Sequence, residues 1–283
     1  MRTIVISGGT DGMGRALAST YLGRGDTVVI VGRDPAKGAD FLADADRDGA
    51  RSRAHFIRAD LSLVAENRRV VAEIAATCPV VDVLVFCARH YRSNRTETIE
   101  GLEATFALDY LSRFLLGHGL VAQLERAARP VIVNVSGPGI SKPEIRWDDP
   151  GLARDYDGFT AQFQAGRAND LLGIASTAVY PTNRTRYVLV HPGGVATSFS
   201  GDYDEATAAQ VAAMRLTARP VGEGIVPIVA VIDAPPAEPV SAFMRERRVD
   251  LSPGSADADA VAAMRLHRLT NRLISSLPGD ATS

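Results

Sequence analysis

Short apolar runs recur along the chain, separated by longer stretches of mixed character. The short runs are rich in β-branched residues and are nearly continuous, which is typical of strands buried on both faces of a parallel sheet. They predict strands at residues 3–7, 27–31, 55–57, 80–86, 131–135 and 187–190.

The stretches between these runs are rich in Ala and Leu and have helical spacing of apolar positions. They predict helices over residues 14–24, 35–47, 63–77, 101–127 and 163–180, and a last helix near 256–276. Residues 141–158 and 198–204 have loop composition. The repeated alternation predicts an α/β fold, with a doubly wound parallel sheet and helices on both faces. Because composition shows no break, we expect residues 1–283 to form a single domain.

The composition argues against several classes of function. A formal net charge of −2 over 283 residues gives no electrostatic basis for binding nucleic acid. No apolar stretch approaches the roughly 20 residues of a membrane span, and the first apolar run is too short for a signal peptide. Cys78 and Cys87 are expected to be reduced thiols, and no His/Cys group has metal-ligand spacing. We therefore expect a cytoplasmic protein without metal, membrane or nucleic-acid partners.

The first predicted strand runs into a glycine-rich turn at residues 7–14. Gly8, Gly12 and Gly14 allow a tight turn and a close approach of the main chain to a pyrophosphate. The helix that follows points its free N–H groups at the anion. The alternative is an ordinary β–α turn without a ligand.

The Gly-x-x-x-Gly-x-Gly spacing resembles the short-chain dehydrogenase/reductase (SDR) family, which implies a Rossmann-type fold. Residues 145–149 and the last helix resemble its retinol- and protochlorophyllide-reductase-like branch. The family's long interface helices would correspond to 101–127 and 163–180, which implies a dimer or tetramer. Its substrate loops would lie near 141–160 and 198–218. The resemblance implies cofactor contacts from Gly8, Thr10, Gly12, Met13, Gly14, Asp60, Leu61, Cys87, Ala88, Pro192, Gly193, Val195 and Thr197.

The end of the second strand indicates which dinucleotide binds. An NAD site has Asp or Glu there to hold the ribose 2′-hydroxyl. This chain has Gly32 followed by Arg33, whose guanidinium can bind a 2′-phosphate. The sequence therefore favours NADP(H). The alternative is that Arg33 is a solvated surface residue.

The family's Tyr-x-x-x-Lys pair and its Ser are absent from the matching positions. In one register Gln162 and Gly166 replace the pair, and in the other Phe163 and Arg167 do. Gly137 stands at the serine position and Ser136 one residue before it. Tyr156 is a candidate substitute for the lost proton donor.

The family's helix asparagine is Asp109 in this chain. We hypothesise that Asp109 forms a buried ion pair with Arg167, which could also bind the ribose hydroxyls, because a lone buried charge is costly. The alternative is drift in a pocket that is no longer used.

Three functions remain open. The first is an NADP(H)-dependent oxidoreductase for a small or medium carbonyl or conjugated-alkene substrate, with water, Asp109 or a loop tyrosine supplying the proton. The second is a redox-neutral enzyme, for example a cyclase or isomerase of secondary metabolism. The third is a non-catalytic NADP-binding protein, because a fold does not fix a function.

Overall fold

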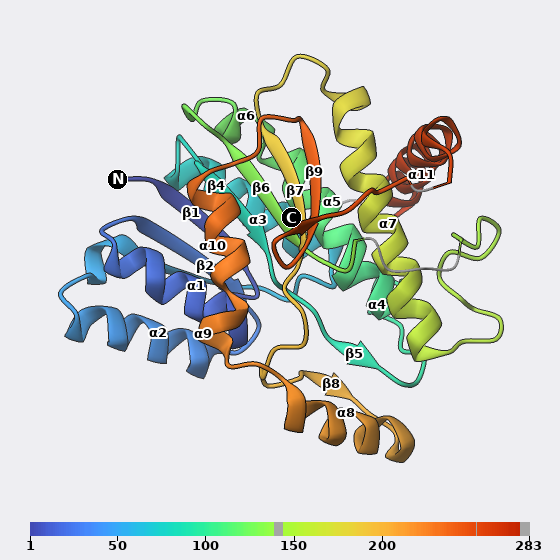
Figure 1. Cartoon of the computed structure of the whole chain (residues 1–283), viewed down its shortest axis with the longest axis horizontal. Coiled ribbons are helices and arrows are strands. Elements are labelled where there is room, and N and C mark those ends of the chain that lie inside the picture. The colour runs from blue at the N-terminus through green and yellow to red at the C-terminus, as the bar shows by residue number, and fades with distance from the viewer. Residues whose placement is uncertain (139–143, 253, 278–283) are drawn as a thin grey trace, which may run out of the picture.

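The computed structural model describes residues 1–138, 144–252 and 254–277. Its centre is an eight-stranded sheet with the order β10-β9-β7-β6-β4-β1-β2-β3 (Figure 1). Every neighbouring pair is parallel except β9 and β10. The strands are β1 (Thr3–Ser7), β2 (Thr27–Gly32), β3 (Ala54–Arg58), β4 (Val83–Phe86), β6 (Val131–Val135), β7 (Arg186–His191), β9 (Val240–Met244) and β10 (Arg247–Arg248). A separate two-stranded sheet pairs β5 (Tyr91–Arg92) with β8 (Gly201–Asp202).

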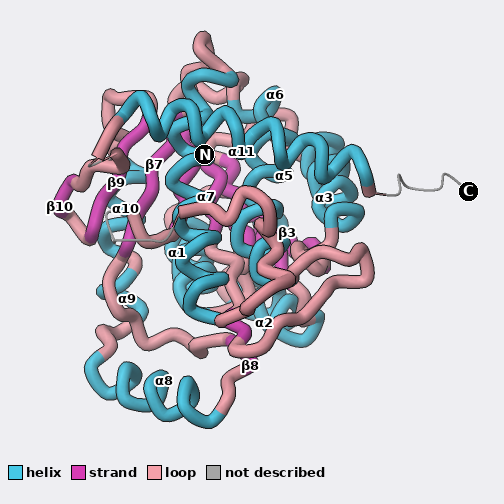
Figure 2. Tube along the Cα trace, turned by 90° about the vertical axis from the view of Figure 1, so that its right-hand side faces the viewer, coloured by secondary structure: helices cyan, strands magenta, loops and turns pink. Residues whose placement is uncertain are grey.

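Helices cover both faces of the large sheet (Figure 1). One face carries α1 (Gly12–Gly23), α2 (Pro35–Arg47), α9 (Val221–Gly224) and α10 (Val226–Asp233). The other carries α3 (Val64–Thr77), α4 (Ala104–Phe106), α5 (Ser112–Gly119), α6 (Val121–Leu124), α7 (Gly158–Val179) and α11 (Ala256–Ser276). Figure 2 shows α8 (Glu205–Thr217) at the edge of the molecule, beside β8. None of the helices described is long and apolar enough to cross a bilayer.

Successive side chains of each strand point to opposite faces of the sheet and pack into two separate cores. Ile4 and Ile6 of β1 pack into the core under α1, α2 and α10, whereas Val5 faces the core under α3, α5 and α7. This double burial explains the continuous apolar runs, because both faces of each strand are covered. The predicted doubly wound α/β fold is confirmed.

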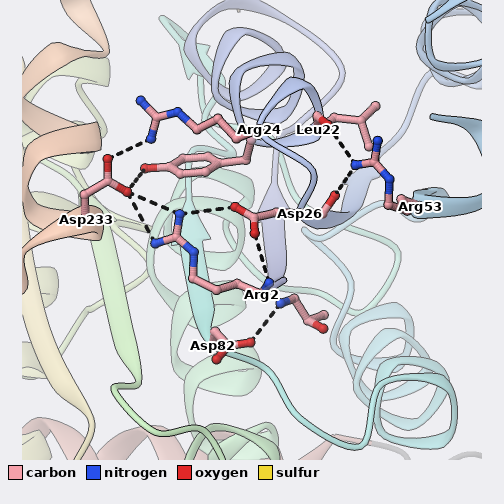
Figure 3. Close-up of polar contacts among 9 residues, drawn as sticks. Arg2, Leu22, Arg24, Asp26, Arg53, Asp82 and Asp233 are labelled. Carbon is pink, nitrogen blue, oxygen red and sulfur yellow. Dashed lines mark hydrogen bonds and ion pairs between the residues drawn. The ribbon is translucent and has the colours of Figure 1, made fainter. Parts of the chain in front are cut away.

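Polar residues fasten the amino ends of the first strands (Figure 3). The Asp26 carboxylate accepts hydrogen bonds from the main-chain N and the guanidinium of Arg2, at 2.9 and 3.1 Å. Asp233, at the end of α10, pairs with both Arg2 and Arg24. Asp82 accepts the first N–H of β1 at 2.8 Å. These contacts join β1, β4, α1 and α10 at the edge of the sheet opposite the glycine-rich turn.

The prediction of a single helix over residues 101–127 is wrong. The segment consists of α4, a π-helical turn at Ala107–Leu111, α5 and α6. A π turn inserts an extra residue without disturbing the apolar character of the segment, so the hydrophobic pattern does not show it. The turn holds Asp109.

Three other expectations need correction. Helix α7 begins at Gly158, five residues before the predicted start, and Asp157 caps it by accepting from Thr160 N at 2.8 Å. The expected loop near 198–218 contains β8 and α8. Strands β9 and β10 were not predicted. Residues 141–143 of the other expected loop lie outside the described residues.

Candidate functional site

The turn between β1 and α1 depends on its glycines. A Cβ added at Gly14 would lie 2.2 Å from the carbonyl oxygen of Gly8. A Cβ at Gly8, where φ is +70°, would lie 2.6 Å from the main-chain N of Ala88. The main chain therefore packs closely on itself and on Ala88 in this turn, which leads directly into the N-terminus of α1, and a helix N-terminus suits a phosphate group. Thr10, Gly12 and Met13 belong to the same turn.

Asp11 caps α1 by accepting a hydrogen bond from Gly12 N at 2.6 Å. Its other carboxylate oxygen pairs with Lys37 of α2. Burial by itself raises the pKa of Asp11, but the bonds from Lys37 and Gly12 outweigh burial and bring the pKa below its ordinary value. The carboxylate is therefore charged, and Lys37 offsets that charge beside the helix N-terminus.

The end of β2 has no space for a side chain. A Cβ at Gly32 would lie 2.7 Å from Cγ2 and 2.8 Å from Oγ1 of Thr10. An acidic residue could occupy this position only by displacing Thr10. Arg33 follows with an exposed side chain. Burial lowers the pKa of His90 although its bond with Asp202 raises it, and the charges of Arg92 and Arg33 add to the lowering.

The ends of β3 and β4 lie at the same carboxyl edge of the sheet. Asp60 accepts hydrogen bonds through Oδ1 from the N and Oγ of Ser62, at 3.0 and 2.7 Å. Leu61 beside it is buried. Cys87 packs against the apolar core, and burial raises its pKa to about 12, so it is a protonated thiol. Ala88 contacts the glycine-rich turn through its main chain.

Arg219 holds the loop that follows β7. Its guanidinium donates to Pro192 O, and its main chain bonds with Gly194 O at 3.0 Å and Ala196 N at 2.8 Å. Gly193 has φ of +89°, in the left-handed region that favours glycine. The loop is therefore held in one shape at the carboxyl edge of the sheet.

Thr197, at the end of this loop, faces the glycine-rich turn. Its Cβ lies 3.1 Å from the position that a Cβ on Gly12 would occupy. Val195 is buried and supports the loop from behind by packing against Gly224. The segments expected to hold the pyrophosphate and the nicotinamide side of a dinucleotide therefore meet at one place.

The small β5–β8 sheet joins the segment after β4 to the segment after β7 (Figure 1). His90 bonds through Nδ1 to Ser200 Oγ at 2.7 Å and through Nε2 to Asp202 Oδ2 at 3.1 Å. Tyr91 stacks on Tyr203 with ring centroids 5.4 Å apart. This closure was not predicted, because two-residue strands carry no periodicity.

Asp109 is a buried carboxylate with only 5% of its surface exposed. Burial raises its pKa to about 6, and the nearby guanidinium groups of Arg89, Arg113 and Arg92 oppose that rise. Its Oδ2 lies 4.0 Å from Nε of Arg89. Its Oδ1 has no hydrogen-bond partner among the described residues. Such a carboxyl group can exchange a proton near neutral pH.

A buried polar network holds the turn that carries Asp109. Asn169 donates to Asp109 O at 2.8 Å, and Asn134 donates to Asn169 Oδ1 at 2.9 Å. Arg113 donates to the Asn134 side chain and to the carbonyl oxygen of Val135, at 2.9 Å. It also donates to the carbonyl oxygen of Ala88, at 3.3 Å. Sequence analysis missed Arg113 and Asn134. The available signal was a polar residue inside each of two apolar segments.

The predicted ion pair between Asp109 and Arg167 is wrong. Within the described ranges, Arg167 pairs with Asp259 of α11 and lies 3.8 Å from Glu144. Arg167 and Asp259 are 11% and 13% exposed, so this is a largely buried pair. Positions two apart on a helix do not share a face. Asn169 therefore faces the π turn, while Arg167 faces α11.

The remaining predicted catalytic positions lie on α7 and after β6. Gln162, Phe163 and Gly166 are partly buried on α7. Ser136 donates its main-chain N–H to Val190 O at 3.0 Å, and its Oγ is buried without a hydrogen-bond partner among the described residues. Gly137 follows it, partly buried.

Tyr156 lies beside the start of α4. Its hydroxyl is 3.2 Å from Arg92 O, 3.4 Å from Thr105 Oγ1 and 3.5 Å from Glu103 Oε1. Burial, together with the Glu103 charge, raises its pKa to about 12 despite the bond with Thr105. These contacts give Tyr156 a structural role in fastening the loop before α7 to α4.

Comparison with known proteins gives the family. The model described as short chain dehydrogenase matches residues 2–147, which is more than half of the chain. The chain belongs to the short-chain dehydrogenase/reductase family. It is therefore an SDR-type oxidoreductase, a family whose members use NAD(P) cofactors.

Two curated relatives and one solved structure illustrate the likeness. Dehydrogenase/reductase SDR family member 12 of Bos taurus is 27% identical over 253 residues, or 87% of this chain and 77% of that protein. Retinol dehydrogenase 14 of Mus musculus is 28% identical over 208 residues, or 70% of this chain and 62% of that protein. The crystal structure of an uncharacterized protein from Mycobacterium Paratuberculosis has a TM-score of 0.72 at 20% identity, over 99% of this chain and 96% of that one.

Proposed function

We propose that this SDR protein is an NADP(H)-dependent reductase of a carbonyl or conjugated alkene in a small or medium organic molecule. The observation that carries the cofactor choice is the end of β2, where Thr10 fills the space beside Gly32. An acidic residue, which would bind a ribose 2′-hydroxyl and repel a 2′-phosphate, would fit there only if Thr10 moved. The exposed Arg33 offers paired donors to a 2′-phosphate.

The residues along the carboxyl edge of the sheet fit a dinucleotide. The glycine-rich turn would hold the pyrophosphate, Asp60 and Leu61 the adenine, and residues 192–197 the nicotinamide side. The tight turn that Gly8 and Gly14 permit, followed at once by the N-terminus of α1, supports this fit. When bound, the reduced nicotinamide supplies a hydride.

In this proposal the active site is atypical and Asp109 holds the proton. Its pKa of about 6 keeps a useful fraction protonated near neutral pH, as a general acid requires. Oδ1 is buried and has no hydrogen-bond partner among the described residues, and Asn169 donates to the main chain of the same turn. Arg89, about half of whose side chain is exposed, has its Nε 4.0 Å from Oδ2. With the cofactor bound, a carbonyl would become an alcohol by gaining the hydride at carbon and the Asp109 proton at oxygen.

The cofactor proposal is tested by calorimetry with Arg33→Ala. We expect its Kd for NADPH to rise at least 10-fold, because one charge-assisted contact is worth about 1.5–3 kcal/mol, while NADH binding stays unchanged. Arg47→Ala, an equal loss of charge at the far end of α2, is the control. Tighter binding of NADH than NADPH by the unaltered protein would overturn the proposal.

The chemistry is tested by incubating the protein with NADPH and a panel of aldehydes and enones, following reduced nicotinamide and product mass together. We expect both to change in equal amounts, and Asp109→Asn to lower kcat at least 10-fold with an unchanged KM for NADPH. Product without loss of NADPH would indicate a redox-neutral enzyme. Cofactor binding without any product would indicate a binding protein. Either result would contradict the proposed reduction.

A further inference from the structure

Two guanidinium groups converge on the loop that follows β7. A Cβ added at Gly193 would lie 2.9 Å from Nε of Arg245 and 3.1 Å from Nη2 of Arg219. The two side chains come from different parts of the chain, because Arg245 directly follows β9 and Arg219 lies between α8 and α9. Arg245 is exposed and Arg219 is partly buried. Two positive charges are therefore held side by side at the carboxyl edge of the sheet.

Neither charge has an acidic partner within the described ranges. No salt bridge joins Arg219 or Arg245 to a carboxylate in residues 1–138, 144–252 and 254–277. Among these residues, the side chain of Arg219 has one acceptor, Pro192 O, and its Nε has none. Like charges this close repel one another. An anion beside the two guanidinium groups would offset that repulsion.

The turn that carries Arg245 has a conformation that an arginine rarely adopts. Arg245 and Glu246 form the two-residue connection between β9 and β10. The φ of Arg245 is +56°, in the left-handed region. Its main-chain N donates to His191 O at 2.7 Å, which fixes the turn against the end of β7. Non-glycine residues in this region cluster at ligand sites, and here the turn places a guanidinium beside Gly193.

The strand order separates this pair from the places proposed for the phosphates of the cofactor. Figure 1 shows β9 beside β7, away from β1 and β2. Strands β6 and β4 lie between β7 and β1, and neighbouring strands are about 4.8 Å apart, so the end of β7 is about 14 Å from the end of β1. Arg33 follows β2, one strand further away. An anion held at Gly193 is therefore not the pyrophosphate or the 2′-phosphate.

We propose that Arg219 and Arg245 bind an oxyanion of the substrate, a carboxylate or a phosphate group, at the β7–β9 end of the candidate site. Guanidinium groups bind both kinds of oxyanion through paired hydrogen bonds. The assignment of the oxyanion to the substrate rests on the proposed reductase function, whereas the binding of an oxyanion to this pair does not.

The first test compares NADPH-dependent reduction of 4-carboxybenzaldehyde with that of its methyl ester. We expect kcat/KM to be at least 10-fold higher for the carboxylate, chiefly through a lower KM. Arg245→Asn should reduce this preference to less than 3-fold and leave turnover of the ester unchanged, because asparagine tolerates the left-handed φ of the turn. Arg247→Asn is the matched control, since Arg247 is an exposed residue of the same hairpin. It should change neither substrate.

The second test is calorimetric titration of the NADPH-saturated protein with inorganic phosphate at constant ionic strength. Bound NADPH keeps phosphate out of the cofactor site. We expect saturable binding that Arg245→Asn weakens at least 10-fold and that Arg247→Asn leaves unchanged. The absence of saturable binding, or binding that Arg245→Asn does not alter, would overturn the oxyanion site.

The two tests together separate the sources of the oxyanion. Phosphate binding that depends on Arg245, with equal kcat/KM for the acid and the ester, would show that the site takes a free anion and would overturn its assignment to the substrate. Phosphate binding that depends on Arg245, without reduction of any aldehyde or enone, would contradict the proposed reductase function and support the oxyanion site.

Discussion

The two halves of the candidate site are built by different physical means. In the half formed by β1, β2 and α1, contacts are steric: Gly14 fits against Gly8, and Gly32 against Thr10. In the half formed by the π turn, β6 and α7, buried polar groups meet from distant segments, as Asn134 and Asn169 do. The comparison teaches that the glycine-rich turn, where we propose that the nucleotide binds, is encoded in a short local motif, whereas the surroundings of Asp109 depend on tertiary pairing.

The largest expected effect comes from breaking a buried pair in the second half. Arg167→Met leaves Asp259 charged and largely buried, so we expect a loss of about 3–5 kcal/mol in the free energy of unfolding. The double variant Arg167→Met with Asp259→Leu should regain most of that loss, because no unpaired charge remains. Urea denaturation of the wild type, both single variants and the double variant measures this coupling. Additive losses would show that the two side chains do not act as a pair.

A smaller effect is expected from adding one methyl group in the first half. Gly14→Ala places a Cβ 2.2 Å from Gly8 O, so we expect about 1–3 kcal/mol of destabilisation and weakened NADPH binding. Gly23→Ala, in the last turn of the same helix, has no atom within 4 Å of its added Cβ. It should be neutral or stabilise by up to about 1 kcal/mol. Equal thermal stabilities of the two variants would contradict the steric clash expected between a Cβ at position 14 and the carbonyl oxygen of Gly8.

The smallest effect depends on pH. Burial raises the pKa of Asp109 from 3.8 to about 6, so the folded protein binds this proton more tightly than the unfolded chain. The stability that this group contributes is therefore present below pH 4 and is lost as pH rises to about 6. Over that window the loss is about 3 kcal/mol at most. Asp109→Asn should be more stable than wild type at pH 7 and no more stable at pH 3.5. A difference that does not change with pH would contradict this assignment.

The sequence predicted the strands and helices of the first half closely because local signals and burial agree there. The helix expected over residues 35–47 has those bounds, with Asp34 as its cap. In the second half the hydrophobic pattern was equally clear, but it showed only that residues 101–127 are apolar and helical. It did not show the π turn, because the extra residue leaves the buried face apolar.

Arg167 shows why the site could not be completed from sequence. A buried charge on Arg167 requires a partner. The resemblance to the family suggested Asp109, which stands at the position of the helix asparagine. Asp259, the true partner, lies 92 positions further along the chain on α11. Only the packing of α11 across α7 brings that carboxylate within reach.

The sequence by itself determined the doubly wound α/β fold, the family and the glycine-rich turn, because these follow from residue-by-residue periodicity and from backbone freedom at fixed spacing. Only the tertiary structure decided which buried charges pair, and that Asp109 sits on a π turn with a buried oxygen that has no hydrogen-bond partner among the described residues. Pairing and burial are properties of segments brought together, and no local pattern records them.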